Sequence, residues 1–495
     1  MKRYFLAIDQ GTSSSRAILY NEKLETLKSH QIEVSQSYPH SSWVEQCPEE
    51  LFEAQFACIE KVLEGLDNSA EVYAGITNQR ETSIIWNKNT SKSLYPAIVW
   101  QDMRTTDFCE ELADKGIAET VRNKTGLVLD AYFSATKISW ILNSKPEIRE
   151  AAEAGDLLFG TVDTWLMWKL SNGEKHLTDH SNAARTMLFN IHDLDWDKEL
   201  LDIFNIPVSL LAELKTSQDE YLEFEVQGKK IKLVSVAGDQ NASLFGHTCY
   251  KKGEAKNTYG TGCFLLANTG EEIVESKHGL LSTVAFSLKD KKVFYALEGS
   301  IFIAGSALNW LKNKMQVLED IKESSAIAES VSEEEMENLY FVPAFSGLGS
   351  PYWDMYARGT IIGLNLDTGK NHLIRATLES LAYQTKDVSS SMENDMLCKL
   401  KSLSVDGGGS KNDFMLKFLA GILGIDVLRQ DNVELTAFGI AAMAANFIDL
   451  YSLDELVNMN KNSEQFSVNY DESKKEKLYN GWKKAVNYSK GWLKN

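Results

Sequence analysis

The chain has 495 residues, of which 43% are hydrophobic and 24% are charged, a composition typical of globular proteins. Its 51 basic and 70 acidic residues give a net charge of −19, which argues against nucleic acid or an anionic membrane as the main partner. A chain of this length exceeds what a single hydrophobic core normally contains, so we expect two domains.

The cysteines and the hydropathy of the chain indicate its compartment. The six cysteines are scattered, without a Cys-x-x-Cys pair or a Cys/His cluster, which favours reduced thiols over disulfides or a zinc site. Lys2 and Arg3 precede only a short apolar run, so we expect no signal peptide, and no apolar run approaches membrane length. We therefore expect a cytoplasmic protein without membrane insertion.

The first predicted element is a β-hairpin at the N-terminus. The apolar run Phe5–Ile8 ends in Asp9, residues 11–15 are glycine and hydroxyl residues, and the β-prone run Arg16–Tyr20 follows. Glycine lets the backbone approach a ligand, and successive N–H and hydroxyl groups form a cradle for an anion such as phosphate. Asp9, at the strand end, is placed to hold a divalent metal ion. Taken alone, these residues also fit a serine-rich surface hairpin.

Strands and helices alternate through the rest of the first half. The patterns predict helices over 48–63, 106–118, 135–153 and 241–246, and strands over 73–78, 97–100 and 231–236. Two of the strands lead to charged residues, Arg80 with Glu81 and Asp239, and ligands gather at strand ends in sheets covered by helices. The alternatives are an exposed ion pair for Arg80 and Glu81, and a helix N-cap for Asp239.

A second hairpin of the same design begins the second half. A strand leads into Gly260, Thr261 and Gly262, and another strand leaves this turn. We place the domain boundary near residues 247–253 and expect two related domains, 1–250 and 251–495, each holding one part of a polyphosphate. The competing phosphate-binding device is a Walker loop, and its nearest candidate at 363–371 has the wrong spacing and lacks the following Ser or Thr.

The second half contains further elements with recognisable patterns. They are a helix over 299–311, a turn-rich loop over 345–354, a helix over 373–388, a strand over 403–406 that runs into glycines 407–409, and a helix from Asn412. The basic, aromatic tail from Lys474 to Asn495 predicts a docked terminal helix, with a membrane-surface helix as the alternative.

The motifs at these positions resemble the FGGY family of carbohydrate kinases, in the actin-like ATPase superfamily, from residue 4 to about 445. The matching motifs occupy 7–12, 75–82, 99–102, 160–166, 237–240, 256–264, 341–353, 375–379, 405–408 and 434–439. The segment Asn78–Thr82 is typical of the family members that act on glycerol rather than on larger sugars. The resemblance implies an α/β fold of two actin-like, ribonuclease H-like domains, each a mixed sheet flanked by helices, with a catalytic cleft between them.

The resemblance also implies ATP-dependent phosphorylation of glycerol to sn-glycerol 3-phosphate by a homo-oligomer, a dimer or a tetramer. Asp239 is then the catalytic base, and Asp9 and Asp239 hold Mg²⁺. The implied substrate-binding residues are Arg80, Glu81, Trp100, Tyr132, Asp239, Gln240 and Phe264. The implied ATP-binding residues are Thr12, Ser13, Ser14, Arg16, Thr261, Gly305, Asn309, Gly408 and Asn412.

The sequence departs from the family pattern mainly on the nucleotide side. The departures are Met103 in place of Arg, Asn309 in place of Gln, residues 409–411 in place of Ala-Val-Ala, and residues 430–431 in place of Arg-Pro. Two rival functions remain open: a family kinase for another small polyol, and a catalytically weak regulatory paralogue. An actin-like filament or chaperone ATPase has no use for Arg80, Glu81 and Tyr132.

Overall fold

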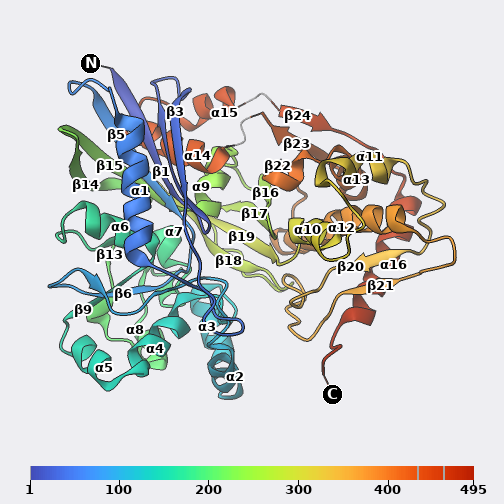
Figure 1. The fold of residues 1–495 in the computed structure, drawn as a ribbon, viewed down its shortest axis with the longest axis horizontal. Helices are drawn as coiled ribbons and strands as arrows, with labels where there is room; N and C mark the ends of the chain where they lie inside the picture. The colour runs from blue at the N-terminus through green and yellow to red at the C-terminus, as the bar shows by residue number, and fades with distance from the viewer. Residues whose placement is uncertain (1, 432–433, 461–462, 495) are drawn as a thin grey trace.

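The computed structural model describes residues 2–431, 434–460 and 463–494, and it contains two large mixed β-sheets (Figure 1). The first sheet has the strand order β14-β15-β5-β1-β2-β3, and the second has the order β18-β19-β17-β16-β22-β23-β24. The first sheet comprises β1 (Arg3–Gln10), β2 (Ser14–Tyr20), β3 (Thr26–Glu33), β5 (Glu71–Asn78), β14 (Gln218–Val226) and β15 (Lys229–Gly238). The second comprises β16 (Ala255–Tyr259), β17 (Cys263–Gly270), β18 (Leu281–Ser287), β19 (Val293–Ile301), β22 (Ser402–Asp406), β23 (Asp426–Gln430) and β24 (Ser463–Phe466).

The two sheets repeat one topology. In the first, β1 pairs antiparallel with β2 and parallel with β5, and in the second β16 pairs antiparallel with β17 and parallel with β22. The hairpin side is extended by β3 or β19, both antiparallel, and the other side by β15 or β23, both parallel. Parallel neighbours need long crossovers, and helices lie in these connections. The predicted α/β fold with two related mixed sheets is confirmed.

Helices cover both sheets, and short strands form small sheets, most of them beside the first, with β20 and β21 beside α12 and α16 of the second half (Figure 1). The first-half helices are α1 (Pro48–Leu63), α2 (Thr106–Asp114), α3 (Ile117–Thr125), α4 (Ser134–Ser144), α5 (Pro146–Glu153), α6 (Val162–Leu170), α7 (His180–Ala183), α8 (Lys198–Phe204) and α9 (Asp239–Gly246). The second-half helices are α10 (Gly305–Asn313), α11 (Ser324–Glu329), α12 (Lys370–Met396), α13 (Asp413–Leu423), α14 (Leu435–Phe447), α15 (Leu453–Met459) and α16 (Glu472–Ser489). The short strands are β4 (Glu45–Gln46), β6 (Ile84–Asn87), β7 (Lys92–Ser93), β8 (Ala97–Ile98), β9 (Leu157–Gly160), β10 (Leu177–Asp179), β11 (Phe189–Asn190), β12 (Asp195–Trp196), β13 (Glu213–Lys215), β20 (Tyr340–Val342) and β21 (Thr360–Ile362).

Helix α14 crosses from the second half of the chain to the first sheet. It packs against β1, β5 and β15 and against α9, beside which it lies in Figure 1. Glycine allows the crossing: a Cβ on Gly439 would lie 1.9 Å from the carbonyl oxygen of Ala242, and one on Gly246 would lie 2.1 Å from that of Leu435. Helix α9, which begins at Asp239, is therefore fixed by a helix from the other half.

Three predicted helices are divided or begin later than expected. The predicted helix over 106–118 is two helices, α2 and α3, because Gly116 between them has a φ of 80° in the left-handed region. The predicted helix over 135–153 is interrupted before Pro146, which cannot continue a helix and instead starts α5. In the segment 299–311, β19 continues to Ile301 and the helix begins only at Gly305, since small apolar residues suit buried strands as well as helices.

The C-terminal segment forms the predicted docked helix, α16. Trp482 is fully buried and stacks on Tyr383 with 5.3 Å between ring centroids. Its Nε1 and the Oη of Tyr479 donate hydrogen bonds of 2.8 and 2.6 Å to the carboxylate of Asp387. Residue 495, at the end of the predicted tail, lies outside the described residues. Across the described ranges, no helix combines the length and the apolar character that crossing a membrane requires.

Candidate active site

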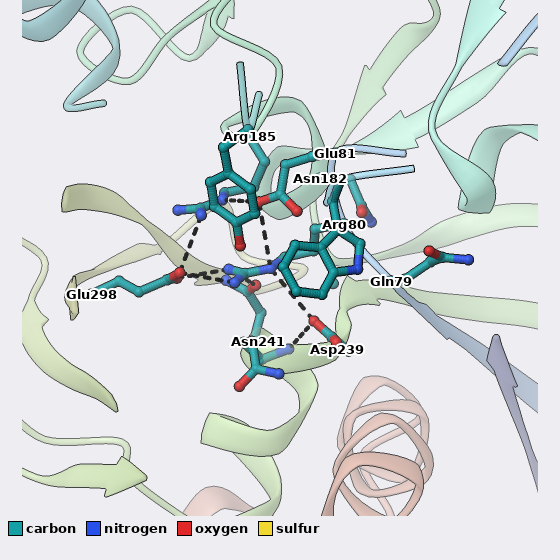
Figure 2. A network of polar contacts seen from close by, with 12 residues as sticks. Gln79, Arg80, Glu81, Asn182, Arg185, Asp239, Asn241 and Glu298 are labelled. Atoms are coloured by element: carbon teal, nitrogen blue, oxygen red, sulfur yellow. Dashed lines mark hydrogen bonds and ion pairs between the residues drawn. The ribbon is translucent and has the colours of Figure 1, made fainter. Parts of the chain in front are cut away.

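Arg80 and its acidic neighbours form a buried network where the first sheet meets the second (Figure 2). Nη1 and Nη2 of Arg80 donate hydrogen bonds of 2.7 and 2.9 Å to the two carboxylate oxygens of Glu298, which lies on β19. Nε of Arg80 lies 3.4 Å from Oδ1 of Asp239 and 4.0 Å from Oε1 of Glu81. Arg80 is 3% exposed and Glu81 1%, so the alternative of an exposed ion pair is wrong.

Arg185, which follows α7, completes this network. Its Nε donates a 2.6 Å hydrogen bond to Oε1 of Glu81, and its Nη2 donates a 3.1 Å hydrogen bond to Oε1 of Glu298. Neither Arg185 nor Glu298 is among the site residues predicted from the sequence. The only sequence signal for Glu298 is that it is a single acidic residue within an apolar strand. A buried charge needs partners, but the sequence around Glu298 does not show which distant residues they are.

Burial and ion pairing oppose each other at the two glutamates. Burial alone would raise the pKa of Glu298, but Arg185 and Arg80 outweigh it and hold this pKa at about 2. At Glu81 burial is the larger influence, so its pKa is raised although Arg185 and Arg80 act to lower it. Glu298 is therefore ionised at every physiological pH.

The turn after β5 gives Arg80 and Glu81 their positions. Glu81 has a φ of 63°, in the left-handed region, which is uncommon for a residue with a side chain and is often found at functional sites. Its carbonyl oxygen accepts hydrogen bonds from the hydroxyls of Ser83 at 3.0 Å and Ser134 at 2.9 Å. These bonds fix the turn and hold both charged side chains in the network.

Three aromatic residues predicted to bind substrate lie together. The ring centroid of Trp100 is 5.6 Å from that of Tyr132 and 6.0 Å from that of Phe264, both in edge-on arrangements. Nε1 of Trp100 donates a 3.0 Å hydrogen bond to Oγ1 of Thr12 in the first hairpin. The cluster provides an apolar wall and connects it to the hairpin that we predict to bind phosphate.

Asp239 and Gln240 begin helix α9. The helix takes Gly238 as its N-cap, and the side chain of Asp239 is 32% exposed beside Arg80, so the alternative of a simple N-cap does not explain Asp239. Gln240 is 8% exposed, and its Oε1 accepts a 2.5 Å hydrogen bond from Nζ of Lys256 on β16. The carboxylate of Asp239, which is partly exposed and lies beside Arg80, suits proton transfer.

The first hairpin presents the predicted metal and phosphate residues. Thr12, Ser14 and Arg16 are half-buried, and Ser13 is exposed. Burial raises the pKa of Asp9 to about 7, an effect that Arg16 opposes and the nearby carboxylate of Asp239 adds to.

These two carboxylates form a small candidate metal site. In the described part of the chain, no group of three or more His, Cys, Asp and Glu residues could hold a metal ion. Asp9 and Asp239 still fit Mg²⁺, because this ion keeps several waters and needs only one or two carboxylates beside phosphate groups. The raised pKa of Asp9 also indicates a carboxylate that a cation would stabilise.

The second hairpin lies against the predicted nucleotide residues. The N–H of Gly305 donates a 3.0 Å hydrogen bond to the carbonyl oxygen of Gly260, and a Cβ on Gly305 would lie only 2.6 Å from that oxygen. A Cβ on Gly408 would meet nothing within 4 Å, so the protein leaves open space there.

Two asparagines predicted to contact the nucleotide have different surroundings. Asn412 is the N-cap of α13, and its Nδ2 donates a 3.0 Å hydrogen bond to the hydroxyl of Ser324. Asn309 is exposed on α10. Asn412 is thus held in place by its neighbours, whereas Asn309 projects from a helix surface.

Comparison with known proteins agrees with this arrangement. The N-terminal domain of the FGGY family of carbohydrate kinases matches residues 4–246, and the C-terminal domain of that family matches residues 255–446. A glycerol kinase of Desulforamulus reducens is 51% identical to this chain over 99% of each, and one of Bacillus cereus is 50% identical over 99% of this chain and 100% of that protein.

Solved structures give the same result. The crystal structure of Plasmodium falciparum glycerol kinase with ADP is 35% identical and has a TM-score of 0.92, over 99% of this chain and 98% of that one. A xylulose kinase of Lactobacillus acidophilus, 21% identical over 99% of this chain and 100% of that one, shares the fold with a TM-score of 0.87. From its two matched domains and its full-length relatives, the chain belongs to the FGGY family of carbohydrate kinases.

Proposed function

We propose that this protein transfers the γ-phosphoryl group of ATP to glycerol, giving ADP and sn-glycerol 3-phosphate. The observation that carries the proposal is the buried turn of Arg80 and Glu81 with Asp239 beside it, which gathers a donor, an acceptor and a base in a small space. The full-length relatives that are about half identical, all named glycerol kinases, support the same substrate.

The residue chemistry suits a short neutral triol. Arg80 donates hydrogen bonds, Glu81 and Asp239 accept them, and between them these groups match three hydroxyls. Further polar contacts come from the amide of Gln240 and the phenol of Tyr132. The rings of Trp100 and Phe264 provide apolar faces for the carbon chain.

Asp239 is the proposed general base. Its carboxylate accepts the proton of the attacking hydroxyl as the oxygen bonds to the γ-phosphorus of ATP, and the bond from that phosphorus to the leaving ADP oxygen breaks. Arg80, whose Nε lies 3.4 Å from Oδ1, orients this carboxylate. Mg²⁺, held by Asp9 and Asp239, would supply neutralisation of the phosphate charge.

The two hairpins and the glycine loop are proposed to hold ATP. Hydroxyls, backbone N–H groups and one cation suit the phosphates, and the glycine positions suit close approach of the adenosine. The proposed residues are Thr12, Ser13, Ser14, Arg16, Thr261, Gly305, Asn309, Gly408 and Asn412. The cytoplasmic location, the dimeric or tetrameric assembly and the domain boundary near residue 250 also stay predictions.

A coupled assay of ADP release with glycerol and a panel of polyols tests the proposal. Because each hydroxyl is matched by a polar group, a diol leaves a buried group unpaired, and rejection should be strong. We expect glycerol to be preferred over 1,2-propanediol, 1,3-propanediol, dihydroxyacetone and erythritol in kcat/KM. A higher value for another polyol would replace glycerol as the substrate, and no turnover with any of them would favour a regulatory paralogue.

A further inference from the structure

Four of the buried side chains beside Asp239 form a cluster with balanced formal charge. Arg80 and Arg185 contribute two guanidinium groups, and Glu81 and Glu298 contribute two carboxyl groups. Each of the four is at most 3% exposed, so water screens their charges little. The network around Arg80 and Arg185 in Figure 2 is therefore a buried region without excess positive charge.

Glu298 is the acidic member that is hydrogen-bonded to both arginines. Its carboxylate accepts hydrogen bonds from both terminal nitrogens of Arg80 and from Nη2 of Arg185. Within the described chain, Oε1 of Glu81 accepts a hydrogen bond only from Nε of Arg185. Glu298 comes from β19 of the second sheet, while both arginines come from the first half. Nη1 of Arg185 is buried and has no hydrogen-bond partner among the residues described, so this guanidinium group could still donate a hydrogen bond to a ligand.

Without Glu298, this cluster would resemble a receptor for anions. Two adjacent guanidinium groups are the usual protein ligands of carboxylates, because their forked donors match the two oxygens. With Glu298 present, the best donors of Arg80 are occupied, and a ligand carboxylate would meet three acidic groups, those of Glu81, Asp239 and Glu298.

We propose that Glu298 is a specificity-determining residue, which acts through Arg80 and Arg185 to make the site accept a neutral polyol and reject the corresponding hydroxy acid. The relevant acid for glycerol is glycerate, which has the same three carbons and carries a carboxylate in place of one hydroxymethyl group. This inference rests on the proposed function in taking glycerol as the ligand of Arg80.

The test replaces Glu298 with Gln, which keeps the shape and removes the charge. Titration calorimetry on the nucleotide-free protein gives dissociation constants for glycerol and for glycerate, and their ratio measures selectivity. We expect Glu298→Gln to weaken glycerol binding, strengthen glycerate binding and lower the selectivity ratio by about tenfold or more. The matched control is Glu379→Gln: Glu379 is also buried and accepts a 2.7 Å hydrogen bond from Arg375, but both belong to α12. It should leave the ratio unchanged.

A double variant separates charge from shape. Arg185→Gln combined with Glu298→Gln removes one charge of each sign, so the formal balance returns although both side chains have changed. We expect its selectivity ratio to recover to within about threefold of the wild-type value. A double variant as unselective as Glu298→Gln would show that packing, not charge, sets the preference, and would overturn the proposal.

The remaining outcomes also decide the question. An unchanged ratio in Glu298→Gln, or an equal fall in Glu379→Gln, overturns the proposal. If thermal melting shows that Glu298→Gln does not fold, Arg185→Gln gives the opposite test, because loss of a positive charge must raise the ratio. Wild-type turnover is measured separately: protein that binds glycerol without phosphorylating it refutes the proposed function alone, and protein that binds no glycerol refutes both.

Discussion

The two hairpins occupy equivalent places in the two sheets, but they are supported in different ways. In the first, side chains provide most of the support: Nε2 of Gln46 donates a 2.8 Å hydrogen bond to the carbonyl oxygen of Thr12, and Nε1 of Trp100 donates to its hydroxyl, beside one backbone bond from Val34 to Ser13. In the second, the backbone provides most of it: the N–H groups of Ala304 and Gly305 donate to the carbonyl oxygens of Thr261 and Gly260 at 2.9 and 3.0 Å, and the hydroxyl of Ser306 is the side-chain contribution, donating to Thr261.

This difference predicts different roles for the two hairpins, the chemical step for the first and nucleotide binding for the second. Around the first hairpin lie the charged groups Asp9, Arg16 and Asp239, which suit the chemical step. The turn of the second hairpin carries no charged side chain, and its close contact with α10 requires glycine rather than any particular side chain. We therefore expect substitutions at the first site to change turnover or several kinetic constants, and substitutions at the second to change nucleotide binding or stability.

The largest expected effect concerns the charged residues around the first hairpin. Asp239→Asn should lower kcat by about 10²–10⁴-fold, the usual cost of losing a general base, while the amide still binds glycerol. Steady-state kinetics and glycerol titration of the nucleotide-free variant measure the two effects. A variant that keeps more than half of the wild-type kcat would show that Asp239 is not the general base, and it would count against the different roles proposed for the two hairpins.

The next effect concerns the backbone-supported hairpin. In Gly305→Ala the new methyl would lie 2.6 Å from the carbonyl oxygen of Gly260, so we expect destabilisation of about 1–3 kcal/mol and a higher KM for ATP. The matched variant is Gly408→Ala, where a methyl meets nothing within 4 Å. It should melt like the wild type and raise only the KM for ATP; an unchanged KM would place the nucleotide away from Gly408.

Much of this arrangement can be predicted from the sequence, because its signals are local. A strand that ends in Asp9 before glycine and hydroxyl residues, and a second one before Gly260, identify both hairpins without knowledge of the fold. The same holds for Asp239 at a strand end. These patterns predict the repeated topology, whereas most residues of the proposed substrate site follow only from the family resemblance.

The parts that escaped prediction depend on contacts between distant segments. Glu298 has functional partners 113 and 218 positions away, and nothing beside it in the sequence distinguishes it from an ordinary strand residue. The packing of α14 on the first sheet is equally non-local. Helix breaks at Gly116 and before Pro146 are different: their residues are visible in the sequence, but propensity alone does not show whether the chain bends or stops there.

A smaller effect tests the side-chain support of the first hairpin. Trp100→Phe removes the indole donor to Thr12 and keeps an aromatic face, so we expect a loss of about 0.5–1.5 kcal/mol in binding, divided between ATP and glycerol. The control is Trp196→Phe, which removes a 2.9 Å hydrogen bond to the carbonyl oxygen of Ala212. Only the Trp100 variant should raise both KM values; equal behaviour of the two would mean that the bond to Thr12 is merely structural.

The smallest effect sharpens the nucleotide side. Asn309 is exposed on α10 and one methylene shorter than the Gln usual in the family, so its amide would fall short of the adenosine or reach it through water. Asn309→Gln should lower the KM for ATP by up to about tenfold and leave kcat nearly unchanged, since the group binds ground and transition states alike. With ATP varied at saturating glycerol, a flat KM removes Asn309 from the site, and a collapsed kcat means that it has another role.

The position of α14 has a consequence for the synthesis of the protein on the ribosome. One face of the first sheet, including Phe5 and Val234, is buried in the same cluster as Leu435 and Ile440 of this helix. The ribosome adds about 190 residues between α9 and α14, which takes about 10–40 s at about 5–20 residues per second. Through that interval the face lacks its cover by α14, so we expect chaperones to bind the nascent chain, and we expect a fragment that contains the first sheet but ends before Leu435 to aggregate.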